Sequence, residues 1–197
     1  PGNKLMRLDV YLVDDSKSMR ISLPATPMRL EEIKNHLGIT RTNEIAGFDT
    51  VVNGGCKRLE AVEPCGFDDF DHVLEFTAKL QRLSEHDYNK ALSAMEVEGP
   101  EEYYDALEIL DRLNKYVLLP RNVNTPWDYA DYGLRKELWG FETPEELRDF
   151  IDYQKLGEYM MWEDGVRETE SGWLIRTDQP FERGPEPTLN DGPAMTM

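Results

Sequence analysis

The sequence predicts an α+β protein with a small N-terminal α+β unit, an acidic helical bundle in the middle and a C-terminal α+β unit. Apolar residues alternate with polar ones near both ends of the chain, whereas in the middle they recur at the helical period. Prolines, glycines and cap residues mark the helix ends. Together with a step in charge, these features predict domains at 1–65, 66–119 and 120–179, followed by a flexible tail at 180–197.

The composition excludes several classes of partner. The 197 residues include 39 Asp and Glu against 22 Lys and Arg, a net charge of −17. Direct binding to nucleic acid or to an anionic membrane is disfavoured, because phosphate contacts need clustered Lys and Arg. A 40% hydrophobic content with 4 Trp, 9 Tyr and 7 Phe favours a folded core over a disordered acidic chain. No apolar run is long enough for a membrane span or resembles a signal peptide, so we expect a cytoplasmic protein.

The excess of negative over positive charge lies in the last two thirds of the chain. Residues 1–65 contain nine basic and nine acidic residues, whereas 66–111 alone carry a net charge of −10. This step suggests a domain boundary and an anionic surface with a function. The alternative is a solvated surface that keeps the protein soluble by charge repulsion.

The first third combines strand and helix signals. Leu8–Val13 and the alternating segment Met19–Leu23 are predicted strands. A helix is predicted from Thr26 to Gly38, because threonine and proline open it and glycine is favoured just past a helix end. The sequence at 53–55, Asn-Gly-Gly, predicts a turn.

Three helices are predicted in the middle. The first begins at Asp68 or Asp69 as N-cap. Its inward positions follow the helical period: Phe70, Val73, Leu74, Thr77, Leu80 and Leu83. Ser84 caps the second helix, and the third, Glu101–Asn114, follows a Gly-Pro pair. Short loops predict antiparallel neighbours in a small bundle.

The last third returns to mixed structure. Segments 125–140 and 143–157 are predicted helices, because each begins with Thr-Pro and has an acidic residue at the fourth position. Tyr159–Trp162 and Gly172–Thr177 are predicted strands of a closing sheet.

Motifs of known catalytic and metal-binding chemistry are missing. His36, His72 and His86 have no partners at ligand spacing, and Cys56 and Cys65 match no metal or redox spacing, so free thiols are expected. No phosphate-binding glycine loop or nucleophile elbow occurs. We therefore expect no metal, no cofactor and no enzymatic activity.

A carboxylate-pair hydrolase is the catalytic alternative. The candidates are Glu101 and Glu102 beside Tyr103 and Tyr104, and Asp128 and Asp131 beside Trp127, Tyr129 and Tyr132. Among 39 carboxylates, however, adjacent pairs arise by chance. The aromatic residues also fit core positions of helices, and we favour that role.

Carboxylate spacing supports a binding function. On a helix, Glu101, Asp105 and Glu108 would share one face with axial steps of about 6 and 4.5 Å. This pitch is of the same order as the roughly 3.4 Å between successive phosphates of a DNA strand. Because close like charges cost stability, such a row suggests a basic partner, namely a cationic groove that normally holds nucleic acid.

One segment carries a family resemblance. Residues 150–160, Phe-Ile-Asp-Tyr-Gln-Lys-Leu-Gly-Glu-Tyr-Met, resemble the ψIDYxxxGrdl motif of the ArdA antirestriction proteins of conjugative plasmids and transposons. Residues 172–175 resemble the closing strand of that family, and the acidic run at 100–105 is similar. The resemblance spans roughly residues 6–178. The N-terminal part departs from the family pattern, because the predicted strand at 19–23 lacks tryptophan.

The resemblance implies an elongated three-part protein, often a homodimer joined through its C-terminal part, without catalytic residues or cofactor. Its acidic surface would mimic bent double-stranded DNA and occupy the DNA-binding groove of a type I restriction-modification enzyme. Matching the acidic positions gives this surface: Asp68, Asp69, Asp71, Glu75, Glu85, Asp87, Glu98, Glu101, Glu102, Asp105, Glu108, Asp128, Asp131, Glu142, Glu145, Glu146 and Asp149. For Asp68 and Asp128, helix capping is the favoured role. Asp152, Tyr153 and Gly157 are assigned to folding or to a dimer contact.

A different basic target remains an alternative to the restriction enzyme. The same acidic scaffold could inhibit another DNA-binding or defence protein.

Overall fold

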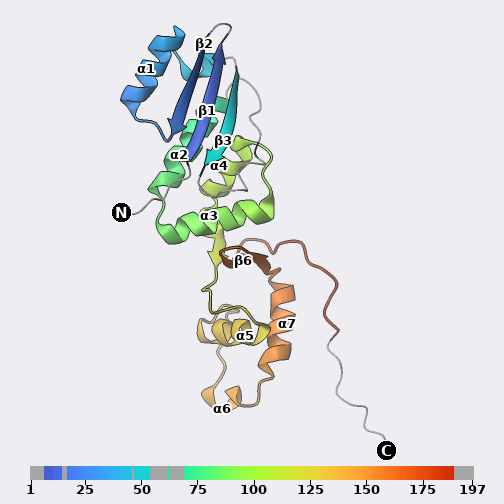
Figure 1. Ribbon diagram of the computed structural model, residues 1–197. Coiled ribbons are helices and arrows are strands. Elements are labelled where there is room, and N and C mark those ends of the chain that lie inside the picture. Colours follow the sequence, from blue (N-terminus) through green and yellow to red (C-terminus); the bar gives the residue numbers. More distant parts are fainter. Residues whose placement is uncertain (1–6, 15–16, 46, 54–61, 63–68, 189–197) are drawn as a thin grey trace, which may run out of the picture. The chain divides into compact units, whose positions relative to one another are not determined.

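The chain divides into two compact units, Pro1–Asn114 and Lys115–Met197 (Figure 1). The computed structural model describes residues 7–14, 17–45, 47–53, 62 and 69–188. Each unit contains helices and a three-stranded sheet, so the predicted α+β class is confirmed. Several predicted features lie outside the described residues: the glycines of the turn at 53–55, Cys56, Cys65 and Asp68.

The first unit opens with an antiparallel sheet in which β1 lies between β2 and β3. Its elements are β1 (Arg7–Asp14), β2 (Lys17–Leu23), α1 (Pro27–Leu37), η1 (Thr42–Glu44), β3 (Gly47–Asn53), α2 (Asp69–Arg82), α3 (Glu85–Glu98) and α4 (Tyr103–Asp111). Both predicted strands and the helix after them are present. Thr26 accepts a hydrogen bond from the backbone N–H of Arg29, and Gly38 ends α1 in the left-handed conformation at φ 74°.

Helices α2, α3 and α4 form the helical part of this unit. Helix α4 packs against both α2 and α3 (Figure 1), and the rings of Phe76 and Tyr103 meet edge to face at 5.7 Å. Phe70 of α2 meets Phe48 of β3 at 5.4 Å, which joins the helices to the sheet. The predicted cap Ser84 accepts a hydrogen bond from the Asp87 N–H.

The third predicted helix is shorter than Glu101–Asn114. Helix α4 covers only Tyr103–Asp111, because Glu102 has an extended backbone (φ −124°, ψ 155°) and acts as the N-cap. After Arg112 the chain tightens into a 3₁₀ turn, η3 (Leu113–Lys115). Glu101 therefore precedes the helix instead of lying on it.

The second unit is built around two packed helices and a small sheet. Its elements are β4 (Tyr116–Leu118), α5 (Pro126–Arg135), α6 (Glu145–Arg148), α7 (Tyr153–Glu163), β5 (Arg167–Thr169) and β6 (Gly172–Arg176). The antiparallel sheet has the order β4-β6-β5, which confirms the predicted strand at 172–177. Tyr129 is the fully buried centre of the core, with Leu119 and Val123.

Helix α5 ends earlier than predicted. It stops at Arg135, and Glu137 turns the chain with a positive φ of 52°. The Trp139 ring then lies directly over Gly133, where any Cβ would overlap it. The helix ends because the chain folds back to bury Trp139 against its own last turn.

The predictions for 143–157 and for Tyr159–Trp162 are wrong in the same way. In place of one helix and a strand, the structure has the four-residue α6, a break and then α7, which contains Tyr159–Trp162. Asp152 caps α7 by accepting the Lys155 N–H at 3.1 Å. Gly157 lets α7 approach α5 so closely that a Cβ there would overlap the Pro126 carbonyl. A short apolar run does not distinguish strand from helix, and this packing selects the helix.

The chain remains packed beyond Pro180. Phe181 is buried and its ring stacks on Tyr116 at 6.3 Å. The Trp162 Nε1–H donates to the Gly184 carbonyl at 2.8 Å. The segment predicted as a flexible tail thus contributes side chains and backbone to the second unit up to Gly184.

Candidate functional site

The predicted acidic residues fall on both units. In the first unit, Asp69, Asp71 and Glu75 lie on α2, Glu85, Asp87 and Glu98 on α3, Glu101 and Glu102 before α4, and Asp105 and Glu108 on α4. In the second unit, Asp128 and Asp131 lie on α5, Glu142 lies between α5 and α6, Glu145 and Glu146 lie on α6, and Asp149 is its C-cap.

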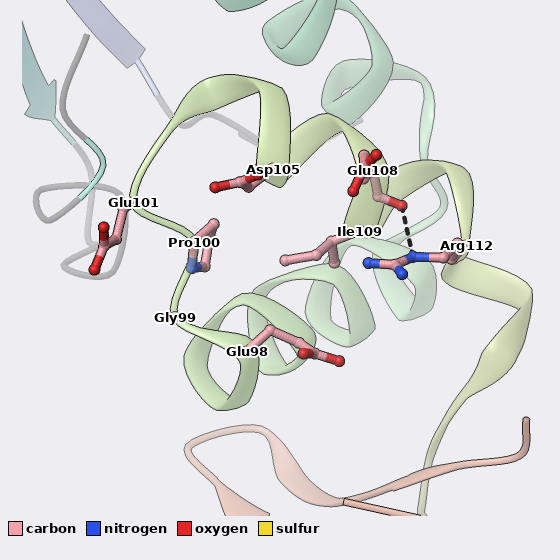
Figure 2. A pocket seen from close by; sticks show the side chains of 8 residues that line it. All are labelled: Glu98, Gly99, Pro100, Glu101, Asp105, Glu108, Ile109 and Arg112. Carbon is pink, nitrogen blue, oxygen red and sulfur yellow. Dashed lines mark hydrogen bonds between the residues drawn. The ribbon is translucent and has the colours of Figure 1, made fainter. Parts of the chain in front are cut away.

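A hollow of about 340 Å³ opens where α3 ends and α4 begins. It is lined by Glu98, Gly99, Pro100, Glu101, Asp105, Glu108, Ile109 and Arg112. Figure 2 shows that the acidic residues of the lining come from three places: the end of α3, the connection after it and α4 itself. The structure thus brings together four of the predicted residues around one concave surface.

Helix α4 has one buried and one charged face. Tyr103, Ala106 and Leu107 are buried, whereas Asp105 and Glu108 are exposed one helical turn apart, about 4.5 Å along the axis. The prediction that Glu101, Asp105 and Glu108 share one helix face is wrong for Glu101. That residue lies in the connection before α4, and only Asp105 and Glu108 lie on the helix. Burial of the opposite face fixes the direction in which these two carboxylates point.

The carboxylates of Glu101, Glu102, Asp105 and Glu108 have no partners in the part of the chain that the structure describes. Within the described part of the chain, none of them forms an ion pair or a side-chain hydrogen bond. Holding them close together costs electrostatic free energy. Their charge is therefore available to an external cation.

Arg112 is the basic residue of the hollow lining. Its Nε–H donates to the Glu108 backbone carbonyl at 3.3 Å, one turn earlier (Figure 2). Arg112 was not among the predicted site residues, although its position four residues after Glu108 was an available signal in the sequence. It reduces the negative charge of the hollow without pairing with a carboxylate there.

Other acidic residues of α2 already have a partner inside the protein. Lys79 pairs with Glu75 at 3.0 Å and with Asp111 at 2.6 Å. Its pKa is raised, first by the hydrogen bond to Asp111 and then by that to Glu75. Asp71 accepts a hydrogen bond from the Thr42 hydroxyl. These carboxylates are less available to a partner than those around the hollow.

The two acidic residues at the start of α3 differ from each other. Asp87 pairs with Lys90 at 3.0 Å and accepts a hydrogen bond from the Ser84 hydroxyl. The Lys90 hydrogen bond is the main cause that lowers the Asp87 pKa. Glu85 is exposed and has no such partner among the described residues.

The acidic residues of α5 have structural roles. Asp128 accepts hydrogen bonds from the Thr125 N–H at 3.1 Å and the Thr125 hydroxyl at 2.7 Å, which completes a capping box. These bonds lower its pKa, the Thr125 hydroxyl contributing most. Capping by Asp128 is thus confirmed. Asp131 pairs with Arg135 one turn later.

The acidic residues around α6 are exposed and unpaired. Glu142, Glu145, Glu146 and Asp149 form no ion pair or side-chain hydrogen bond with another described residue. They provide a second group of available carboxylates, on the second unit.

The three residues of the family motif each have a structural role within the second unit. Asp152 caps α7, and the Tyr153 ring lies 5.1 Å from that of Trp127. Gly157 makes the closest approach between α5 and α7. Asp152 therefore stabilises the start of α7, whereas Tyr153 and Gly157 contribute to the contact between α7 and α5.

The aromatic residues beside the carboxylate pairs divide between core and surface. Tyr103 and Tyr129 are fully buried, which confirms the core role for these two. Tyr104 and Trp127 are about half exposed, at 53% and 49%. A sugar platform at α4 would thus have Tyr104 as its single exposed ring.

The described residues contain no cluster of three His, Cys, Asp or Glu side chains that could hold a metal ion. Within the same residues, no helix combines the length and apolar character needed to cross a membrane.

A comparison with protein-family models supports the resemblance independently. Residues 17–175 match the model described as Antirestriction protein (ArdA). A comparison with individual curated proteins gives no match. Because the matched segment covers far more than half of the chain and includes the hollow, α6 and the 150–160 motif, the protein belongs to the ArdA family of antirestriction proteins.

Proposed function

We propose that this antirestriction protein acts as a DNA mimic that blocks the DNA-binding groove of a type I restriction-modification enzyme. The observation that carries the proposal is the set of carboxylates around the hollow that pair with no described residue, namely Glu101, Asp105 and Glu108. A DNA-binding groove presents Lys and Arg side chains positioned for phosphates. Exposed carboxylates on a folded scaffold can pair with the same cations in place of the phosphates. This mechanism needs no catalytic residue and no cofactor.

The mechanism is electrostatic competition. The net charge of −17 steers the protein toward a basic groove, so association should be fast and sensitive to salt. The partner would be the enzyme itself, in the cytoplasm, where restriction and modification take place. The carboxylates around α6, which have no partner among the described residues, would form a separate part of the mimic on the second unit.

The test is inhibition of a purified type I enzyme. At about 50 mM salt, an excess of the protein should abolish both DNA binding and cleavage, and inhibition should weaken as salt rises. The paired change Asp105→Asn/Glu108→Gln should raise the half-inhibitory concentration about tenfold. The control is Glu31→Gln/Glu32→Gln on α1, which removes two exposed carboxylates that lie away from the hollow and already pair with Lys34 and Arg29. It should change the half-inhibitory concentration less than about twofold. Uninhibited DNA binding at low salt would refute the proposal.

Two finer points belong to the same proposal. We expect a homodimer joined through the second unit, with Asp152 and Tyr153 as candidate contacts, and a light-scattering mass tests this expectation.

The second candidate target is another basic DNA-binding or defence protein, since the hollow selects for charge and not for one enzyme. Full inhibition of an unrelated DNA-binding protein together with no effect on the type I enzyme would favour that target.

A further inference from the structure

The connection between α5 and α7 exposes four large apolar side chains. Leu138, Phe141, Leu147 and Phe150 are 37%, 47%, 54% and 84% exposed, and we call them the α6 apolar surface. Only three other large apolar side chains in the described part of the chain are as exposed. Single exposed apolar residues are ordinary, but four of them within residues 138–150 suggest an interaction surface.

The local backbone holds these side chains outward. The Leu147 N–H donates to the Pro144 carbonyl at 3.0 Å, and the Phe150 N–H donates to the Leu147 carbonyl at 3.1 Å. Phe141 stacks on Trp139 at 5.9 Å, and Trp139 is itself anchored by its Nε1–H bond to Asp164. The segment is thus ordered while its apolar side chains remain in solvent.

The same segment carries exposed acidic residues, which we call the acidic rim. Residues 136–150 contain five acidic and two basic residues, a net charge of −3. Glu142, Glu145, Glu146 and Asp149 are all exposed and have no internal partner among the described residues. The surface therefore combines exposed apolar groups with free negative charge, over a single short connection.

We propose that the α6 apolar surface binds a basic amphipathic helix of a partner protein. The apolar stripe of such a helix would cover Leu147 and Phe150, and its flanking Lys or Arg would pair with the acidic rim. Phosphate mimicry does not use exposed leucine and phenylalanine, so this surface has a role beyond the DNA-like carboxylates. The rim repels nucleic acid and anionic lipid. A second copy would bring an identical acidic rim against it.

The probe is a synthetic, fluorescently labelled helix of about 14 residues made of Leu and Lys in an amphipathic order. Titrated with the intact chain, it should bind saturably. The change Leu147→Ser/Phe150→Ser should weaken binding about tenfold, and because both side chains are exposed the fold should persist. Met28→Ser, which alters a 74% exposed residue on α1, is the matched control and should leave binding unchanged.

One further variant tests the acidic rim, and a second separates this surface from the hollow between α3 and α4. Glu145→Gln/Glu146→Gln/Asp149→Asn should weaken peptide binding and reduce its salt dependence. Asp105→Asn/Glu108→Gln should leave peptide binding intact even where it abolishes inhibition, so the two proposals can fail separately.

Three outcomes would overturn the inference. The first is equal binding of wild type and Leu147→Ser/Phe150→Ser. The second is equal binding of a scrambled Leu/Lys peptide, which would indicate unspecific charge attraction. The third is a doubled light-scattering mass that the Leu147→Ser/Phe150→Ser change reduces to the monomer, which would assign the surface to a second copy.

Discussion

The Nε–H of Arg112 donates to the backbone carbonyl of Glu108, the residue whose free carboxylate lines the same hollow. The cation is thus held by the helix end and not by the acidic groups around it. This arrangement places one positive charge inside a surface that we propose to compete with DNA phosphates. Loss of this positive charge should therefore strengthen inhibition, whereas loss of a carboxylate should weaken it.

Arg112→Gln should improve inhibition of a type I enzyme. Removing the positive charge strengthens the negative potential of the hollow, and we expect about threefold to tenfold tighter inhibition at low salt. The measurement is the half-inhibitory concentration at low and at high salt, where the gain should fade.

Two variants control this prediction. Arg112→Lys keeps the charge and should behave like the wild type. Arg82→Gln removes an exposed cation of α2 that does not line the hollow, and it should have a smaller effect. Weaker inhibition by Arg112→Gln would instead mean that Arg112 contacts the target directly.

The sequence predicted those helix ends that local signals define. Thr26, Ser84 and Thr125 cap helices as expected, because each cap interaction lies within three residues along the chain. The break before Asp152 and the helix at 159–162 were missed. These depend on the close approach of Gly157 to Pro126, a contact between residues 31 positions apart.

The sequence could predict which acidic residues belong to the candidate site, but not which of them form ion pairs inside the protein. The sequence identified the acidic residues, yet only the structure shows that Lys79 pairs with Asp111 of α4. Asp105 and Glu108, by contrast, pair with none of the residues that the structure describes. A pair that bridges two helices leaves no spacing signal in either one. The hollow itself also depends on Glu101 lying before the helix, which the extended backbone of Glu102 determines.

Asp128→Asn should destabilise the protein most at neutral pH. The change weakens the capping box of α5, at a cost of about 1 kcal/mol in the free energy of unfolding. Because folding lowers the Asp128 pKa, the carboxylate stabilises the fold above the pKa of an unfolded aspartate, near 3.9. This contribution is lost as the pH falls through the lower folded value. Denaturant unfolding of both proteins at pH 7 and near pH 3 checks it.

The control for this change is Asp149→Asn. Asp149 is exposed at the end of α6 and has no partner among the described residues, so its stability difference should be small at every pH. The difference in the free energy of unfolding between wild type and Asp128→Asn should shrink from neutral to acidic pH. A constant difference would contradict the stabilising role assigned to the Asp128 charge.

Gly157→Ala should destabilise the second unit strongly. A Cβ at this position overlaps the carbonyl group of Pro126, which is backbone and cannot turn aside. Separating α5 from α7 would open the packing around both helices, and we expect a loss of about 3 kcal/mol or more. Urea unfolding gives the value.

Gly184→Ala is the matched control in the same unit. A Cβ there meets nothing within 4 Å, so its unfolding midpoint should stay close to that of the wild type. A Gly157→Ala protein as stable as this control would show that α7 can shift without cost.

Asp164 holds two aromatic side chains of the second core. Its carboxylate accepts hydrogen bonds from the Tyr129 hydroxyl and, at 2.8 Å, from the Trp139 Nε1–H. Burial, and then the nearby Asp164 carboxylate, raise the Tyr129 pKa well above its usual range. A negatively charged tyrosinate cannot form in this position without disrupting the core.

Tyr129→Phe should therefore change how stability depends on alkaline pH. At pH 7 the lost hydrogen bond should cost about 1 kcal/mol in the free energy of unfolding. Because the folded pKa of Tyr129 is raised, its stabilising contribution is complete below about pH 10, the value for an unfolded tyrosine, and falls as pH rises further. The gap between wild type and Tyr129→Phe should thus narrow and then reverse above that pH. Tyr104→Phe, which alters an exposed tyrosine, is the control and should show no such crossing. Parallel alkaline unfolding curves for wild type and Tyr129→Phe would mean that Tyr129 ionises in the folded protein as freely as in the unfolded chain.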